Sequence, residues 1–154
     1  LEVSISIILA AVTRSIIIGI VSTLVFFLIV DIKVTNLTYI LYSAFFGSFF
    51  IGSLGFVTGL WATKFDHTAT ITNFIITPLA FLSGVFYTID KLPSIFQTIS
   101  FFNPFFHIIN IFRYGFIGVS DGSIFFGMIY LPILALLAWF LAFILYEKGY
   151  KIKS

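Results

Sequence analysis

The side chains of this sequence that could do chemistry are few, and most of them stand in one short stretch, NPFFHIINIFR. Asn103, His107, Asn110 and Arg113 could bind an anionic group or move a proton. No Ser-His-Asp or Glu-x-x-His spacing accompanies His107, so the stretch lacks the pattern of a hydrolase or a metalloprotease. We therefore interpret His107 as an interfacial polar residue and not as a catalytic base.

Arg113 ends a strongly apolar stretch and stands beside Tyr114. Its side chain could snorkel toward water as an interfacial anchor. Alternatively, the guanidinium could contact an anionic headgroup, or hydrogen-bond to backbone carbonyls that are freed where helices break. The residues alone leave these alternatives open.

Other chemistry is limited by what the sequence lacks. There is no Cys, which excludes disulfides, thiolate metal sites and thiol nucleophiles. There is no GxxxxGK[ST] phosphate loop, so the chain has no ATPase site of that kind. His67 has only Asp66 beside it, which predicts a solvated turn and not a metal site. We therefore expect no cofactor and no metal on this chain, and the net charge of +2 gives no reason to expect nucleic acid.

The composition shows which solvent surrounds the chain. Hydrophobic residues make up 60% of the 154 residues, charged residues make up 9%, and the mean hydropathy is +1.18. A soluble domain of this size keeps too much of its surface in water to hide that many apolar side chains. The sequence therefore predicts an all-α integral membrane protein.

Long uncharged runs locate four transmembrane helices, since a helix needs roughly 20 apolar residues to cross a bilayer. The predicted spans are residues 15–30, 37–62, 71–87 and 123–146. Residues 1–14 are either a helix along the membrane surface or the first turns of a long tilted helix, and residues 147–154 are a tail. No ionisable residue stands in the middle of a predicted span, so proton or sodium coupling is not indicated.

Residues 88–120 stay apolar but are interrupted by Pro93 and by Asn103-Pro104. A fifth span here would place unpaired polar groups in hydrocarbon, at several kcal/mol each. A residue before proline is pushed out of the helical region, and proline suits the first turn of a helix. We therefore predict two short helices that meet at Asn103-Pro104 and form a re-entrant hairpin before the last span. Irregular backbone at such depth must be covered by protein or line a water-filled cavity.

The positive-inside rule orients this arrangement with both ends of the chain in the cytoplasm and the hairpin outside. It does not fix the number of spans, because arrangements with four and with five spans divide the eight Lys and Arg residues equally well.

Small residues cluster in the predicted second span, among them Gly47, Gly55 and Gly59. Small residues on one helix face let helices approach closely. The pattern favours packing inside the subunit over a self-association face, without excluding the latter.

An ordered set of residues in this chain resembles the C-terminal signature of ABC-2 type permeases, the membrane subunits of bacterial ATP-driven exporters. The set comprises Pro78, Ser83-Gly84, Leu92-Pro93, Asn103-Pro104 and Arg113. The lead-in LEVSISIILAAVTRSIIIGI is also similar to the family's cytoplasmic segment and third span. The resemblance covers essentially the whole chain as one domain, residues 1–154, and implies about two further spans before Leu1.

The resemblance implies a mechanism and a set of partners. Two permease subunits, here expected as a homodimer, form a pathway for an amphiphile such as a lipid-linked saccharide, a lipid or a hydrophobic drug, in contact with membrane lipid. Separate ABC ATPase subunits bind ATP and Mg²⁺ and drive export across the bacterial inner (plasma) membrane.

The same resemblance assigns roles to residues of this chain. The hairpin and gate are expected to contain Pro78, Gly84, Pro93, Asn103, Pro104, His107 and Arg113. The surface that couples to the ATPase is expected to contain Glu2, Arg14, Lys64 and Asp66. Asn110 stands where many relatives carry an acidic residue, which predicts a weakened polar network around Arg113.

Two other function classes compete with transport by an ABC subunit. A membrane-embedded lipid-modifying enzyme would need a polar cluster at the interface, which only the residues around Arg113 could supply. A channel or a non-transporting scaffold is the third class, and the lack of charged rings argues against an ion channel.

Overall fold

The computed structural model describes residues 2–30, 34–62, 64–86 and 88–148, without the side chains of Phe65 and Asp90. Every regular element within these residues is helical, which confirms the predicted all-α membrane fold. Three helices there are long and apolar enough to cross a membrane, namely α1 (Glu2–Ile29), α2 (Leu37–Trp61) and α7 (Ile124–Glu147).

A further membrane-sized segment is assembled from three helical pieces without a break, which are α3 (Phe65–Ile71), the π-helical turn η1 (Thr72–Ile76) and α4 (Thr77–Phe81). Pro78 explains the π-turn, because proline has no amide hydrogen and its ring disturbs the preceding turn. The segment is roughly 25 Å long at 1.5 Å per residue, near the lower limit for a span. It ends at Phe81, whereas the sequence predicted a span as far as residue 87.

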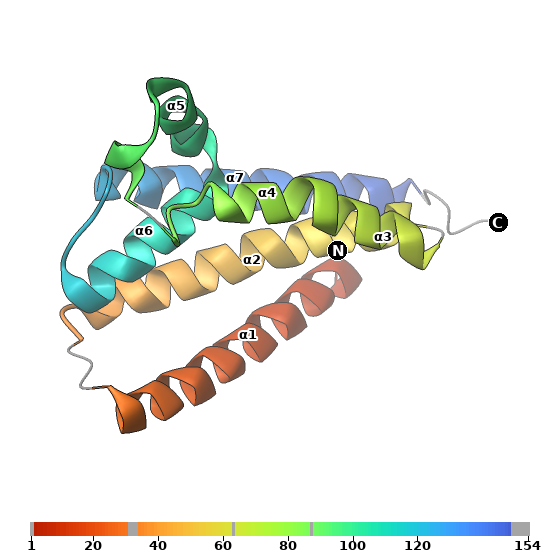
Figure 1. Cartoon of the computed structure of the whole chain (residues 1–154). Helices are drawn as coiled ribbons and strands as arrows, with labels where there is room; N and C mark the ends of the chain where they lie inside the picture. The colour runs from red at the N-terminus through yellow and green to blue at the C-terminus, as the bar shows by residue number, and fades with distance from the viewer. Residues whose placement is uncertain (1, 31–33, 63, 87, 149–154) are drawn as a thin grey trace.

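The successive helices α1, α2, α3–α4 and α7 run in alternating, roughly antiparallel directions (Figure 1). The start of α1, the end of α2, the start of α3 and the end of α7 therefore lie at one end, here called the terminal end. The end of α1, the start of α2, the end of α4 and the start of α7 lie at the other, here called the hairpin end.

Between α4 and α7 the chain forms a 3₁₀ turn, η2 (Ile89–Lys91), and two helices, α5 (Ser94–Phe102) and α6 (Pro104–Ile117). The axes of α5 and α6 differ by 85°. Because α4 ends and α7 begins at the hairpin end, the bent pair returns to the end from which it started (Figure 1). This is the geometry expected of a re-entrant hairpin.

Helix α2 is the centre of the bundle and packs against α1, α6 and α7. Phe50 of α2 forms a small buried core with Ala135 and Ala138 of α7. A Cβ at Gly47 would meet Ile108 and one at Gly52 would meet Ala11, whereas a Cβ at Gly55 or Gly59 would meet no atom of another described element within 4 Å. Gly47 and Gly52 thus pack inside the subunit, as the sequence favoured for the whole cluster, whereas Gly55 and Gly59 do not show that packing among the described residues.

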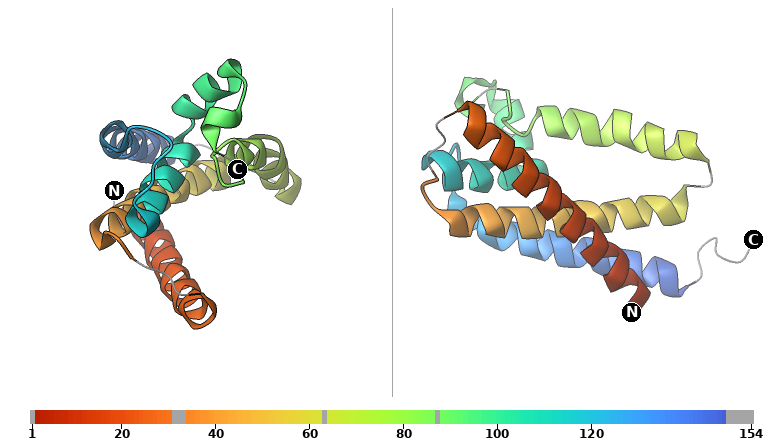
Figure 2. Two further views of the ribbon diagram at one scale, coloured as in Figure 1. Left: turned by 60° about the vertical axis from the view of Figure 1, so that its left-hand side comes forward. Right: turned by 90° about the horizontal axis from the view of Figure 1, so that it is seen from below.

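Helix α1 is continuous from Glu2 to Ile29, with no break between the predicted lead-in and the predicted span. Its buried residues are Ser4, Ile8 and Val12, all in its first half. The second half leans away from α2 (Figures 1 and 2). From Glu2 onward, the lead-in therefore fits the first turns of a long tilted helix better than a separate helix along the membrane surface.

Candidate functional site

The bend between α5 and α6 is fixed by the side chain of Asn103, which is 2% exposed. Its Oδ1 accepts a hydrogen bond from the backbone N–H of Phe105 at 3.0 Å, which caps α6. Its Nδ2 donates to the backbone carbonyl of Leu79 on α4 at 2.6 Å. Asn103 itself is extended, and Pro104 opens the new helix, as the sequence predicted. One buried amide thus joins the ends of three helices.

The last carbonyls of α5 are bound by side chains from neighbouring helices. Nε2 of His107 lies 2.8 Å from the carbonyl oxygen of Phe101, and since a carbonyl only accepts, this nitrogen carries the proton. The hydroxyl of Tyr130 on α7 donates to the carbonyl of Phe102 at 2.7 Å. Carbonyls at a helix end need such partners when water is excluded.

The structure corrects our interpretation of His107 as an interfacial residue. His107 is 1% exposed and is surrounded by the rings of Phe106, Phe126 and Tyr130, with centroids 4.9–5.3 Å away. Its place in the middle of an apolar stretch was the signal for burial. Nε2 has the carbonyl of Phe101 as its partner, whereas the buried Nδ1 has no hydrogen-bond partner among the described residues.

Arg113 on α6 holds the turn that follows α4. One terminal nitrogen forms an ion pair of 2.6 Å with Oδ2 of Asp121, and the other donates to the carbonyl of Gly84. Gly84 has φ +77°, a left-handed conformation that glycine adopts without strain. This is the contact that the bracing alternative for Arg113 expects.

Asp121 was missed by the sequence reasoning, and it overturns the expected weak network around Arg113. Its side chain is 7% exposed and faces Arg113. Its backbone N–H donates to Oδ1 of Asn110 at 2.8 Å, while Nδ2 of Asn110 donates to the carbonyl of Gly122 at 3.2 Å. The negative charge comes from the loop before α7 instead of from position 110. The only signal in the sequence was an acidic residue beside Gly122 just before an apolar run.

The hairpin reaches about half-way along α2. The rings of Phe105 and Phe50 are 6.5 Å apart, and Phe50 is near the middle of α2. Ser43, about two turns nearer the hairpin end than Phe50, donates to the carbonyl of Ile108 at 2.6 Å. The Asn103-Pro104 break is therefore the deepest point of the hairpin and is covered by protein.

Two further residues that were predicted for the hairpin, Pro78 and Pro93, lie at the starts of helices. Pro78 lies in the first turn of α4, and Pro93 immediately precedes α5. Pro93 is exposed, so it shapes the entry to the hairpin without joining the polar contacts described above.

The structure does not bring all four predicted coupling residues together. Glu2, Lys64 and Asp66 are exposed at the terminal end. Arg14 is exposed half-way along α1, and its neighbour Ser15 donates to Ser48 near the middle of α2 at 2.5 Å. Arg14 is therefore an ionisable residue within a long apolar helix, contrary to our expectation for the spans.

His67 also departs from its prediction. It belongs to α3, is half-buried and lies with its ring 5.3 Å from that of Trp61, so it is not in a solvated turn. The structure shows no group of three or more metal-ligating side chains among the described residues.

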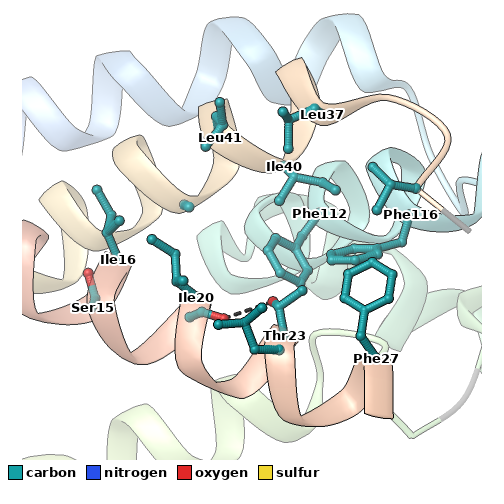
Figure 3. Close-up of a pocket in the computed structure, with 14 residues that line it drawn as sticks. Ser15, Ile16, Ile20, Thr23, Phe27, Leu37, Ile40, Leu41, Phe112 and Phe116 are labelled. Carbon is teal, nitrogen blue, oxygen red and sulfur yellow. Dashed lines mark hydrogen bonds between the residues drawn. The ribbon is translucent and has the colours of Figure 1, made fainter. Parts of the chain in front are cut away.

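Where α1 leans away from α2, a cavity of about 270 Å³ opens between α1, α2 and α6 (Figure 3). Ile20 and Phe27 face Ile40 of α2 and Phe112 and Phe116 of α6 across it. The hydroxyls at its edge are engaged within the chain, since Thr23 donates to the carbonyl of Gly19 and Ser15 to Ser48. The lining thus suits an apolar group.

Comparison with known proteins identifies the family. Residues 1–117 match the family model described as ABC-2 type transporter. The chain belongs to this family. This membership agrees with the resemblance seen in the sequence, and the long apolar helices agree with a membrane protein of several spans.

Curated relatives support the same assignment. The chain is 32% identical over 110 residues to "Inner membrane transport permease YadH" of Escherichia coli K12, which covers 71% of this chain and 43% of the relative. It is 39% identical over 61 residues to "Nodulation protein J" of Rhizobium leguminosarum bv. trifolii, covering 40% of this chain and 23% of the relative. The chain spans less than half the length of these relatives. No solved structure gives a significant match.

Proposed function

We propose that this chain is the pathway-forming part of the membrane subunit of an ATP-driven exporter, acting with separate ABC ATPase subunits and a second permease subunit. The substrate is an amphiphile: a lipid-linked saccharide, a lipid or a hydrophobic drug. Both ends of the chain lie in the cytoplasm, so the hairpin end faces outward. Family membership and the name of the Escherichia coli relative support the transport role.

The observation that carries the proposal is the closed hairpin. It penetrates to the level of Phe50, and polar side chains that are buried or partly buried bind the carbonyls of Leu79, Gly84, Phe101 and Phe102. Irregular backbone at membrane depth is stable only with such cover, or beside a water-filled cavity. A segment that closes the outer half of the bundle through a few polar contacts fits a gate, because such contacts can exchange between two arrangements.

The apolar cavity between α1, α2 and α6 supports the substrate class. It offers carbon on nearly all sides and no free hydroxyl among its described lining, which suits the apolar part of an amphiphile. The exposed groups at the terminal end, Glu2, Lys64 and Asp66, support the placement of ATPase contacts there.

The test is purification of the full-length protein in mild detergent, with mass spectrometry of its partners and an ATPase assay. A stoichiometric partner with a phosphate loop, whose ATPase activity depends on the permease, is the expected result. A protein that stays alone after chemical crosslinking in intact membranes, and turns over a lipid without nucleotide, would replace this proposal by the lipid-enzyme class.

A further inference from the structure

A second cavity, of about 520 Å³, lies at the hairpin end beside Arg113 and is separate from the apolar cavity of Figure 3. It is formed by the turn after α4, the 3₁₀ turn η2, the last turn of α6 and the loop before α7. Its described lining is Gly84, Val85, Phe86, Thr88, Lys91, Arg113, Ile117, Val119 and Asp121. Unlike the first cavity, it combines charged and apolar side chains.

The charges in this cavity favour an anion. Among the described side chains that line it, Lys91 and Arg113 are cationic and Asp121 is acidic. Arg113 directs one N–H toward Asp121 and one toward Gly84, whereas a guanidinium carries five donors. Arg113 is therefore held in place by two contacts and retains donors for a third partner. Lys91 is exposed, so its ammonium can turn toward a ligand in the cavity.

The walls of the cavity favour an amphiphile with that anionic group. Val85, Phe86, Ile117 and Val119 are 51–71% exposed and line the cavity together with the charged side chains, and these four residues are here called the rim. Arg113 lies less than one turn from Gly115, which contacts Asn36 and Ile40 at the start of α2. The site is therefore level with the end of a transmembrane helix, where lipid headgroups meet water.

We propose that this cavity binds a phosphate-type anion, with Lys91 and Arg113 as its cationic contacts, and that the exposed apolar rim receives the first carbons of an attached chain. The shared chemistry is a phosphate group, which comes either from an amphiphile headgroup or from free phosphate. The inference concerns binding alone and does not depend on the energy source or direction of transport.

The experiment uses protection of a single thiol in the full-length protein, in a background free of other cysteines. Val119→Cys places the thiol on the rim, and its maleimide labelling rate is measured in phosphatidylcholine nanodiscs. Three probes are compared: dihexanoyl phosphatidic acid, inorganic phosphate, and dihexanoylglycerol, which has the same chains without the phosphate. No nucleotide or ATPase is present, so failure of the transport proposal leaves this test intact.

We expect phosphatidic acid to slow labelling and dihexanoylglycerol to leave it unchanged. Equal protection by inorganic phosphate at the same concentration would identify free phosphate as the sufficient ligand, whereas protection by phosphatidic acid alone would identify an amphiphile headgroup. Either result supports the anion site.

A matched pair of variants tests the residues. Lys91→Gln removes the flexible cation and is expected to weaken protection about fivefold to tenfold, the usual effect of losing one charge-assisted contact. Lys148→Gln makes the same charge change at the terminal end and should have no effect, since Lys148 is exposed at the end of α7. Equal protection in both variants, protection by dihexanoylglycerol, or no protection by either anion would overturn the proposal.

Discussion

Arg113 and Asp121 form an ion pair of 2.6 Å that joins the end of α6 to the loop before α7. Because Arg113 also donates to Gly84, the pair ties the exit of α4 to the entry of α7. The hairpin is thus closed at its base by one arginine.

The first prediction concerns the stability of this pair. Arg113→Ala and Asp121→Ala should each lower the free energy of unfolding by about 2 kcal/mol, because each leaves a largely buried partner without its charge-assisted contact. The double variant should lose clearly less free energy of unfolding than the two single variants lose together, which corresponds to a coupling free energy of at least ~1 kcal/mol. Thermal unfolding in detergent measures the cycle, and strictly additive effects would show that the two side chains do not stabilise each other.

The second prediction concerns transport. Arg113→Ala should lower export by about tenfold, or ~1.4 kcal/mol in the rate-limiting barrier, while the amount inserted in the membrane changes little. The reason is that the side chain acts on the base of the hairpin and not on the spanning helices. Transport of a fluorescent amphiphile into inverted vesicles, normalised to permease in the membrane fraction, measures both. Normal export by this variant would refute a bracing role in transport.

The break at Asn103-Pro104 could be predicted because it is local chemistry: proline restricts the residue before it and starts the next helix. The partners of that break could not be predicted in the same way. Asn103 binds Leu79, 24 residues away, and Arg113 binds Gly84, 29 residues away, only after the chain has folded back on itself. Spacing along the sequence carries no signal for such contacts.

Some helix ends could be predicted from the sequence, and others could not. The uncharged runs predicted the bounds of α2 and α7 to within one residue, and both helices begin directly after a polar N-cap, Asn36 or Ser123. The end of α4 at Phe81 was missed, since the residues that follow remain apolar and the helix stops where the hairpin packs against it. The first span was predicted to begin at residue 15, directly after Arg14. The helix α1 instead begins at Glu2, because a single charge does not end a helix.

The third prediction concerns the close approach of α6 to α2. A Cβ at Gly115 would lie 2.5 Å from Cγ1 of Ile40, 3.0 Å from its backbone nitrogen and 3.1 Å from the carbonyl oxygen of Asn36. Gly115→Ala should therefore destabilise the protein by about 1–3 kcal/mol through overpacking. Gly19→Ala is the control, because a Cβ there would meet no atom of another described element within 4 Å, and it should be neutral or slightly stabilising. Equal unfolding temperatures of the two variants would contradict this packing.

The fourth prediction concerns the hydroxyl of Tyr130. Tyr130→Phe removes the hydrogen bond to the carbonyl of Phe102 and should cost about 1 kcal/mol, because the carbonyl at the end of α5 then lacks this donor. Tyr39→Phe is a matched control, since the contact described for Tyr39 is the ring packing against Tyr114, which phenylalanine keeps. A loss of stability in the control as large as in Tyr130→Phe would speak against the assignment.

The central claim is that α5 and α6 form a hairpin that returns to the side from which it entered, and sidedness of labelling tests it most directly. Single cysteines replace Thr88, before the hairpin, and Ser120, after it, both of which are exposed. Lys148→Cys marks the terminal end. An impermeant maleimide applied to intact spheroplasts should label positions 88 and 120 and should label position 148 only after lysis. If positions 88 and 120 label from opposite sides, the bent pair is a broken span and the account of the hairpin is wrong.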